Sequence, residues 1–448
     1  KGLKAYFEKH QYSNTIGRDL WNALGDASGR DVAAFMDSWL EQPGYPVLTA
    51  VVENDTLKIS QKQFFIGEHE DQGRQWVVPL NSNWSGIPDT LETETLEIPG
   101  YAALAAANSE PLRFNTENTA HYITDYQGEL LDAIVDNMAS LDNLSKQQIL
   151  QERRLLAESG VISYASLLPV IEKLTQESSY LVVSAVSSIL QGLSLFVDEG
   201  TEVEAAYKKL LVTFNQFNFE RLGFEPKAGE ADEDEMVRQL VISNMIKGDD
   251  AKASAKASEI YAAHADDISK LPAAIRLQIL INQIKHHESK ELTDLYLNTY
   301  AQATDGNFKR QLSTALAYTT DADTVEKILT EWKNKDVVKP QDLAMSWYFT
   351  FLHHEFTQES AWTWARENWE WVKAALGGDM SFDKFVIYPA NTFKTAERLA
   401  EFKAFFEPQL SDMAISRNIS MGIKEIAARV DLIQREKAAV EAAILATK

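Results

Sequence analysis

The chain has 448 residues, no cysteine, and 66 acidic against 43 basic side chains, which gives a net charge of −23. This acidic excess argues against nucleic acids and anionic membrane surfaces as partners, because both repel carboxylates. The lack of cysteine excludes disulfides, thiol nucleophiles and cysteine-based metal sites. No stretch approaches the roughly 20 apolar residues that a membrane span needs, and the length predicts about three domains.

Residues 1–44 show helical periodicity. Leu3, Tyr6 and Phe7 fall on one helical face, and the same spacing recurs from Val32 to Trp39. Because the chain starts at Lys1 without Met and a helical pattern begins at once, we expect it to be a piece of a longer protein.

Residues 45–125 change to a period of two, which is typical of strands. Residues 47–53 and 57–61 alternate on either side of the turn at Asn54 and Asp55, so they predict a β-hairpin. Further strand candidates are residues 63–66, 75–80 and 94–98. Together these segments predict a small β-sandwich.

Residues 126–448 return to helical spacing. One apolar face runs from Tyr126 to Met138 and another from Tyr207 to Phe217. Capping patterns at Ser145, Thr201 and Asp323 predict helix starts. This length corresponds to about 16 helices. So many helices do not fit around one hydrophobic core, which favours stacked antiparallel helix pairs. The predicted fold class is therefore mainly α: an α-helical superhelix of HEAT/armadillo-like stacked helix pairs, preceded by a small β-sandwich and a few helices.

Two local features invite a functional interpretation. Five acids fall within residues 230–235, and we interpret them as a solvated loop that leads into the acidic first turn of a helix, with a calcium site as the alternative. Five of the ten Trp lie between Trp347 and Trp371. Residues 361–371 are predicted to be one helix, whose Trp pack in the interior; stacking on a peptide or sugar is the alternative.

Histidine spacing gives no complete metal motif. A zinc-protease helix carries H-E-x-x-H so that both imidazoles reach one ion. The nearest matches are HEFTQ at residues 354–358, which ends in Gln, and HESKE at residues 287–291, which ends in Glu. The adjacent pairs 286–287 and 353–354 diverge by about 100° on a helix. We interpret these histidines as structural or surface residues, with His287 and Glu291 as an alternative zinc pair. No residue is predicted to be catalytic, cofactor-binding or metal-ligating.

Several segments resemble one known family from end to end. Residues 2–7 (GLKAYF), 12–15 (YSNT) and 19–24 (DLWNAL) resemble the close of the catalytic domain in zinc aminopeptidases of the aminopeptidase N family, and residues 36–47 (MDSWLEQPGYPV) resemble its M-x-x-W-T-x-Q-x-G-Y-P-V junction. Residues 152–160 and 222–224 are similar to segments of its C-terminal helical domain. The pattern is most similar to the cytoplasmic members from lactic acid bacteria and related Firmicutes.

Two departures limit the resemblance. Ile123 stands where many members have Arg, so a contact made by that Arg does not carry over. The chain also has neither the G-x-M-E-N nor the H-E-x-x-H motif of the family.

The resemblance implies three parts: a helical tail of the zinc-peptidase catalytic domain (1–44), a β-sandwich linker (45–125) and a superhelical C-terminal domain (126–448). It further implies a zinc-dependent enzyme that removes N-terminal residues from peptides, with zinc in the full-length enzyme and no cofactor in this part.

This part would close the active-site chamber and limit access, with the upstream catalytic domain and peptide substrates as partners and a cytoplasmic location. The alternative is a stand-alone acidic helical-repeat scaffold that binds a protein or a basic peptide.

Overall fold

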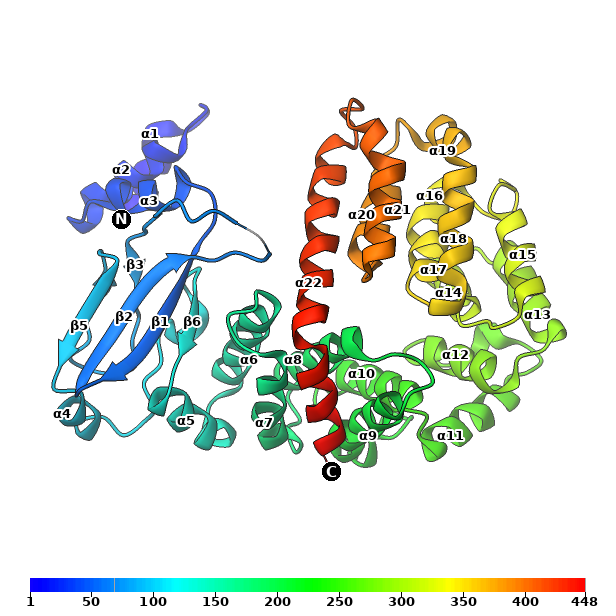
Figure 1. Ribbon diagram of the computed structural model, residues 1–448, viewed down its shortest axis with the longest axis horizontal. Helices are drawn as coiled ribbons and strands as arrows, with labels where there is room; N and C mark the ends of the chain where they lie inside the picture. The colour runs from blue at the N-terminus through cyan, green and yellow to red at the C-terminus, as the bar shows by residue number, and fades with distance from the viewer. Residues whose placement is uncertain (68, 448) are drawn as a thin grey trace. The chain divides into compact units, whose positions relative to one another are not determined.

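A computed structural model describes residues 1–67 and 69–447, which form two compact units, 1–162 and 163–448. Unit 1 begins with three helices and continues as a small sheet region with further helices (Figure 1). Its elements are α1 Gly2–His10, α2 Gly17–Ser28, α3 Val32–Leu40, β1 Pro46–Glu53, β2 Thr56–Gln63, β3 Val78–Pro79, β4 Thr90–Leu91, β5 Thr95–Pro99, α4 Tyr101–Ala106, the 3-10 turn η1 Thr116–Asn118, β6 Ile123–Tyr126, α5 Glu129–Asp136, η2 Met138–Ser140 and α6 Asn143–Glu158.

The main sheet of unit 1 has the strand order β5-β2-β1-β6, and β3 pairs separately with β4. The β1–β2 hairpin confirms the prediction, with Val52 opposite Leu57 and the tight turn at Asn54 and Asp55, both at positive φ. Two expected strands are shorter or absent, since residues 64–66 are not in a strand and only Val78–Pro79 of 75–80 is. The sequence analysis missed β6, which pairs parallel to β1, because it is only four residues long and does not alternate.

Unit 2 is entirely helical among its described residues. Its helices, 3-10 turns and one π-helix (η7) are η3 Tyr164–Leu167, α7 Leu168–Ile171, η4 Glu172–Leu174, α8 Tyr180–Leu193, η5 Ser194–Phe196, α9 Glu202–Leu222, α10 Asp234–Lys247, α11 Ala251–Ala262, η6 Ile268–Lys270, α12 Arg276–His287, α13 Lys290–Gln302, α14 Gly306–Leu316, α15 Ala322–Glu331, α16 Pro340–Asp342, η7 Leu343–Tyr348, α17 Phe349–Leu352, α18 Glu355–Glu367, α19 Trp369–Leu376, α20 Lys384–Thr392, α21 Ala396–Phe406, η8 Glu407–Gln409 and α22 Ser416–Ala446.

Successive helices of unit 2 pack on one another, as in α9 with α10, α11 with α12 and α13 with α14. The long helix α22 then returns to the first turns of the unit, where it contacts η3, η5 and α9 (Figure 1). A continuous apolar core runs through these helices from Val183 to Ile426. The fold is therefore mainly α, with a superhelix of packed helices after a small sheet region, as predicted.

Local details correct several expected helix boundaries. Thr201 is the N-cap of α9, as predicted, and accepts from Glu204 N at 3.2 Å. The other two helices start earlier than predicted. Asp142 rather than Ser145 caps α6, and Asp321 rather than Asp323 caps α15. Residues 361–371 are not one helix, since α18 ends at Glu367 and α19 starts at Trp369.

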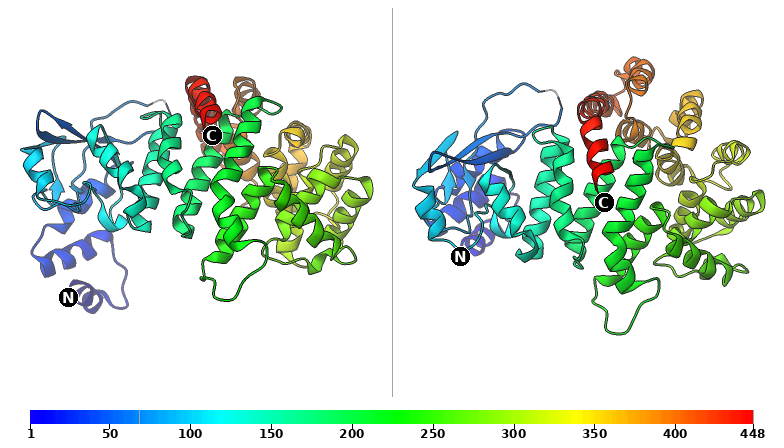
Figure 2. Two further views of the ribbon diagram at one scale, coloured as in Figure 1. Left: turned by 90° about the horizontal axis from the view of Figure 1, so that it is seen from below. Right: turned by 60° about the horizontal axis from the view of Figure 1, so that its bottom comes forward.

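The first compact unit extends beyond the predicted sandwich, because α5 and α6 belong to it. Tyr126 marks the change from strands to helices, whereas contacts divide the chain after Ile162. The three-part division at 44 and 125 therefore stays a prediction about family domains. Within unit 2, the connection between α9 and α10 extends away from the helix ends (Figure 2).

Candidate functional site

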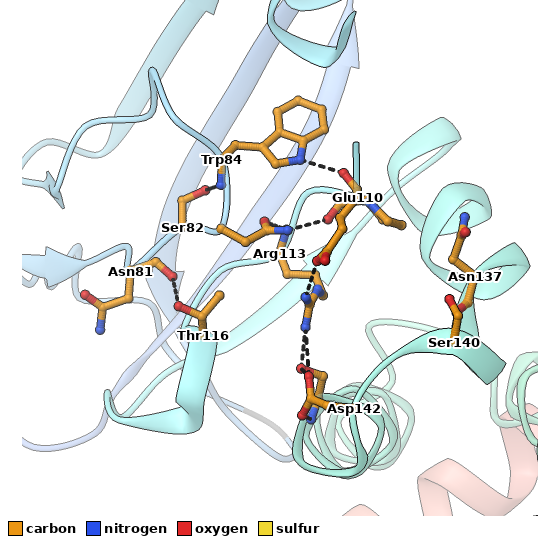
Figure 3. A network of polar contacts seen from close by, with 12 residues as sticks. Asn81, Ser82, Trp84, Glu110, Arg113, Thr116, Asn137, Ser140 and Asp142 are labelled. Atoms are coloured by element: carbon orange, nitrogen blue, oxygen red, sulfur yellow. Dashed lines mark hydrogen bonds and ion pairs between the residues drawn. The ribbon is translucent and has the colours of Figure 1, made fainter. Parts of the chain in front are cut away.

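Arg113 joins the loop after α4 to the start of α6, within unit 1 (Figure 3). Its guanidinium donates to Glu110 Oε2 at 2.8 Å, contacts the Ser145 hydroxyl, and lies 3.6 Å from Asp142 Oδ2. Asp142 is also the N-cap of α6 and accepts from Ser145 N at 2.9 Å. The same arginine is held through its backbone, which exchanges two hydrogen bonds with Asn83. Arg113 therefore fixes the N-terminus of α6 against the sheet region.

The next turns of α6 add further hydrogen bonds to the sheet region. We call the contacts of Arg113 and Glu152 together the polar joint. Gln148 Nε2 donates to the Phe114 carbonyl at 3.4 Å and to Glu152 Oε1 at 2.8 Å. Glu152 Oε2 accepts from Thr124 N of β6 at 3.1 Å. Because Glu152 is buried, its pKa rises to about 8, and hydrogen bonds from Gln148 and Thr124 only partly oppose this shift. These bonds explain why α6 belongs to unit 1.

Sequence reasoning missed the joint, although Glu152 lies in a segment quoted for the resemblance. The available signal was polar side chains at core-facing positions of α6: Gln148, Glu152 and Arg153 are all buried. Buried polar groups need partners, so their spacing could have predicted a docked helix. The geometry around Arg113 and Glu152 is that of a structural connection between a helix and a strand.

The histidine candidates do not converge. His287 is the last residue of α12, whereas Glu291 lies in the next helix, α13, and His287 Nε2 lies 3.2 Å from the Ser258 hydroxyl. His354 precedes α18 and packs on Tyr318, with ring centroids 4.0 Å apart. Gln358 Nε2 donates a hydrogen bond to the Leu352 carbonyl oxygen at 2.7 Å. The same-helix spacing that a zinc pair needs is therefore broken in both segments.

The acidic residues within 230–235 were expected to be solvated, but two of them form ion pairs. Glu230 pairs with Arg238, and Asp234 pairs with Arg221 at 2.6 Å. Asp234 is the first residue of α10 and is buried rather than solvated, while Asp232 and Glu235 are exposed. The run therefore begins α10 as predicted, but two of its acids hold the loop to neighbouring helices.

The Trp cluster packs inside unit 2. Trp347, Trp362, Trp364 and Trp369 are buried, and Trp371 is partly exposed. Trp362 donates its indole N–H to Glu401 Oε2 at 3.0 Å and packs against Phe393 with centroids 5.2 Å apart. Interior packing is thus the role of the four buried Trp. The Trp residues expected on one helix are divided between α18 and α19.

Helices α1 to α3 leave apolar side chains exposed. Leu3, Phe7 and Ile16 are 55%, 65% and 69% exposed, and α2 and α3 contain no fully buried residue. A surface pocket of about 290 Å³ lies between α1 and α2, lined by Lys1, Ala5, Lys9, Asp19, Asn22, Ala23, Asp26 and Ala27. We call Leu3, Phe7 and Ile16 the exposed N-terminal face. An apolar face of this kind is typical of a surface that contacts another protein part.

Comparison with known families places most of the chain. The ERAP1-like C-terminal domain matches residues 112–428. The chain belongs to this family. The Peptidase family M1 domain matches residues 1–39, which are the helices that carry the exposed N-terminal face. The family resemblance is therefore confirmed.

Relatives of this ERAP1-like chain include bacterial and plant aminopeptidases. It is 59% identical to "Aminopeptidase N" of Lactococcus lactis subsp. lactis over 445 residues, which cover 99% of this chain and 52% of that protein. For "Aminopeptidase N" of Lactobacillus helveticus the identity is 41%, with the same coverage. "Aminopeptidase M1" of Arabidopsis thaliana is 25% identical, covering 95% of this chain and 50% of its own length. The chain thus spans about half the length of these relatives.

The described part of the ERAP1-like chain offers no set of groups suited to zinc. In residues 1–67 and 69–447, no three His, Asp or Glu side chains come together as a metal ion requires. The two sequence candidates, His287 and His354, are held by other contacts, as described above. No helix in these ranges combines the length and apolar composition of a membrane span.

Proposed function

We propose that this chain is the C-terminal, non-catalytic part of a zinc-dependent aminopeptidase that removes N-terminal residues from peptides. Its family and its relatives favour this function over a stand-alone acidic scaffold. Zinc would be bound by the catalytic part, since no three His, Asp or Glu side chains come together among residues 1–67 and 69–447. The intact enzyme would act in the cytoplasm.

The exposed N-terminal face carries the proposal. Residues 1–39 match the Peptidase family M1 domain, yet Phe7 and Ile16 are mostly exposed and α2 has no buried residue. Helices this short bury apolar side chains only by packing on other elements. The upstream catalytic part is the occupant that fits, because the matched family defines these helices as one piece of its domain.

The three-part division belongs to the same proposal. Residues 1–44 would complete the catalytic domain, residues 45–125 would link it to the helices, and residues 126–448 would form one wall of the active-site chamber. Such a wall would admit short or unfolded peptides and exclude folded proteins.

Complementation tests the proposal directly. The upstream half of the Lactococcus lactis relative would be produced separately, mixed with this chain and zinc, and assayed with an aminoacyl chromogenic substrate. We expect no hydrolysis by this chain alone and hydrolysis by the mixture. A mixture that neither associates nor hydrolyses the substrate contradicts the proposal.

Matched variants locate the contact. Phe7→Asp should weaken association, because a charge on the exposed N-terminal face must be desolvated on docking. Met413→Asp changes an even more exposed apolar residue of unit 2, and should leave association unchanged. Equal effects of both variants would argue against docking through this face.

A further inference from the structure

The strand β5 forms an outer edge of the main sheet in unit 1 (Figure 1). It pairs with β2 on one side, and among residues 1–67 and 69–447 no strand pairs with its other side. The strand at the opposite edge, β6, is buried along its whole length, whereas every residue of β5 is exposed or partly exposed. Of the two edges of this sheet, β5 is therefore the one that is open to a further strand.

Backbone hydrogen bonding shows which groups of β5 face away from the sheet. Gln61 N of β2 donates to the Glu94 carbonyl at 2.9 Å. Bonding alternates along an antiparallel pair, so the even-numbered residues of β5 bond to β2 and the odd-numbered residues point outward. The outward groups are the N–H groups of Thr95 and Glu97 and the carbonyls of Glu97 and Pro99. We call this row the β5 edge.

The apolar side chains of β5 are incompletely covered. Leu96 and Ile98 are partly exposed, although the residues opposite them on β2, Ile59 and Leu57, are completely buried. The side chains of an added strand would lie over Leu96 and Ile98 and remove their remaining apolar surface from water. The β5 edge therefore offers both hydrogen bonds and an apolar strip.

Carboxylates determine which kind of strand fits this edge. Glu92, Glu94 and Glu97 are all exposed. Lys58 of β2 lies opposite Glu97 on the inner side, and an added strand would fill the position on the outer side. Opposite charges on neighbouring strands attract each other and like charges repel. The edge therefore favours a strand that carries Lys or Arg.

The same carboxylates argue against a second copy of this chain as the occupant. Another β5 would bring its own three glutamates to the edge, and such charged edge strands discourage pairing between identical chains. A basic segment of a different protein meets no such repulsion.

We infer that the β5 edge binds an extended, basic segment of another protein by strand addition, antiparallel to β5. Basic residues of the segment lie opposite Thr95 and Glu97, to which their backbones bond. The apolar residues between them lie over Leu96 and Ile98. This inference concerns a partner protein and does not depend on the proposed aminopeptidase function.

Two matched peptides test the register on the 448-residue chain. Both are six residues long, alternate Val and Lys, and have an acetyl group and an amide at their ends. One is N-methylated on its valines and the other on its lysines, so charge and composition are equal. Only methylation of the lysines removes the N–H groups that face β5.

Calorimetry compares the two peptides. We expect the form methylated on valine to bind about tenfold or more tightly than the form methylated on lysine. Equal affinities would show attraction by charge alone and would overturn the inference. So would the absence of binding by the valine-methylated form at roughly 1 mM peptide.

Hydrogen exchange followed by mass spectrometry gives a local readout. The valine-methylated peptide should slow exchange of the Thr95 and Glu97 amides, because these outward groups gain acceptors. Exchange in β1, whose amides lie inside the sheet, should not change. Slower exchange elsewhere without any change in β5 would place the peptide at another surface and overturn the inference.

Variants identify the groups responsible. Glu97→Lys should weaken binding about tenfold, whereas Glu235→Lys makes the same charge change at an exposed glutamate of α10 and should have no effect. Thr95→Pro removes an outward N–H, which an edge strand tolerates, and should also weaken binding. Circular dichroism checks that each variant is folded. Equal losses for Glu97→Lys and Glu235→Lys would contradict the site.

Two further measurements test other occupants of the edge. Sedimentation of the chain alone tests a second copy: a dimer that Thr95→Pro dissociates would overturn the inference. Addition of the upstream half of the Lactococcus lactis relative tests an internal contact. If that half slows exchange at Thr95 and Glu97 and excludes the peptide, the edge belongs to the enzyme's own domain packing and the inference is wrong.

Discussion

The Glu436 carboxylate near the end of α22 accepts a hydrogen bond from the Ser163 hydroxyl at 2.6 Å. The two residues lie 273 positions apart and join the last helix of unit 2 to its first turn. Glu436 Oε2 also accepts from Tyr164 N at 3.1 Å, so it caps η3. The contact closes unit 2 on itself, since α22 packs on both α20 and η3.

Removal of this carboxylate should destabilise unit 2. Glu436→Ala leaves the largely buried Tyr164 N–H without its acceptor, which costs about 1–3 kcal/mol. Urea unfolding followed by tryptophan fluorescence measures the effect, because the Trp cluster lies in this unit. Glu425→Ala changes an exposed glutamate of the same helix and should have little effect. Equal losses would show that α22 is stabilised by general helix effects rather than by this contact.

Glu152 should make the stability of unit 1 depend on pH. Its folded-state pKa of about 8 lies above the ordinary value of 4.5. Its contribution is therefore fully present below about pH 4.5 and is lost as the pH rises through 8. Glu152→Gln should flatten the decrease in unfolding free energy between pH 5 and pH 8, measured by urea titration at each pH.

The same variant should be less stable than the parent at low pH, because its amide NH₂ faces a donor where the carboxylic acid accepted. Glu129→Gln, at an exposed glutamate of α5, is the matched control and should keep the parent's slope. An unchanged slope in Glu152→Gln would mean that Glu152 does not carry the pH dependence.

Arg113 should control the attachment of α6. Arg113→Met removes the contacts with Glu110, Ser145 and Asp142, and we expect a loss of about 1–3 kcal/mol, since Glu110 and Asp142 are largely exposed. Hydrogen exchange should become faster in the first turn of α6 and stay unchanged in β2. Arg30→Met, at an exposed arginine of the same unit, should change neither. Uniform exchange across unit 1 would contradict a local joint.

Trp362 should be among the most sensitive core positions. Trp362→Ala removes a fully buried indole, its hydrogen bond to Glu401 and the packing against Phe393, with an expected loss of about 3–5 kcal/mol. The partly exposed Trp371 should tolerate the same change better. Thermal unfolding of both variants checks the order, and the reverse order would mean that Trp371 is the anchor.

Local sequence signals predicted the type of most elements. The β1–β2 hairpin and the N-cap at Thr201 follow from a turn and a capping residue that act within a few positions. The family resemblance was equally accessible, because the junction at residues 36–47 is a contiguous segment. The sequence also shows the apolar residues of α1, but it does not show that they are exposed to solvent.

Tertiary contacts decided the rest. Helical periodicity assigned α6 to the superhelix, but Arg113 and Glu152 attach it to the sheet region through residues up to 32 positions away. The break at Asn368 separates Trp362 from Trp369, and the end of α12 separates His287 from Glu291.

By itself, the sequence determined the family, the mainly helical class and the lack of a zinc motif, because these depend on residues close together in the chain. Only the tertiary structure decided that Glu152 meets Thr124, and that Glu436 meets Ser163. Packing of distant helices sets such distances and removes water from around the charges, and neither effect is encoded in local spacing.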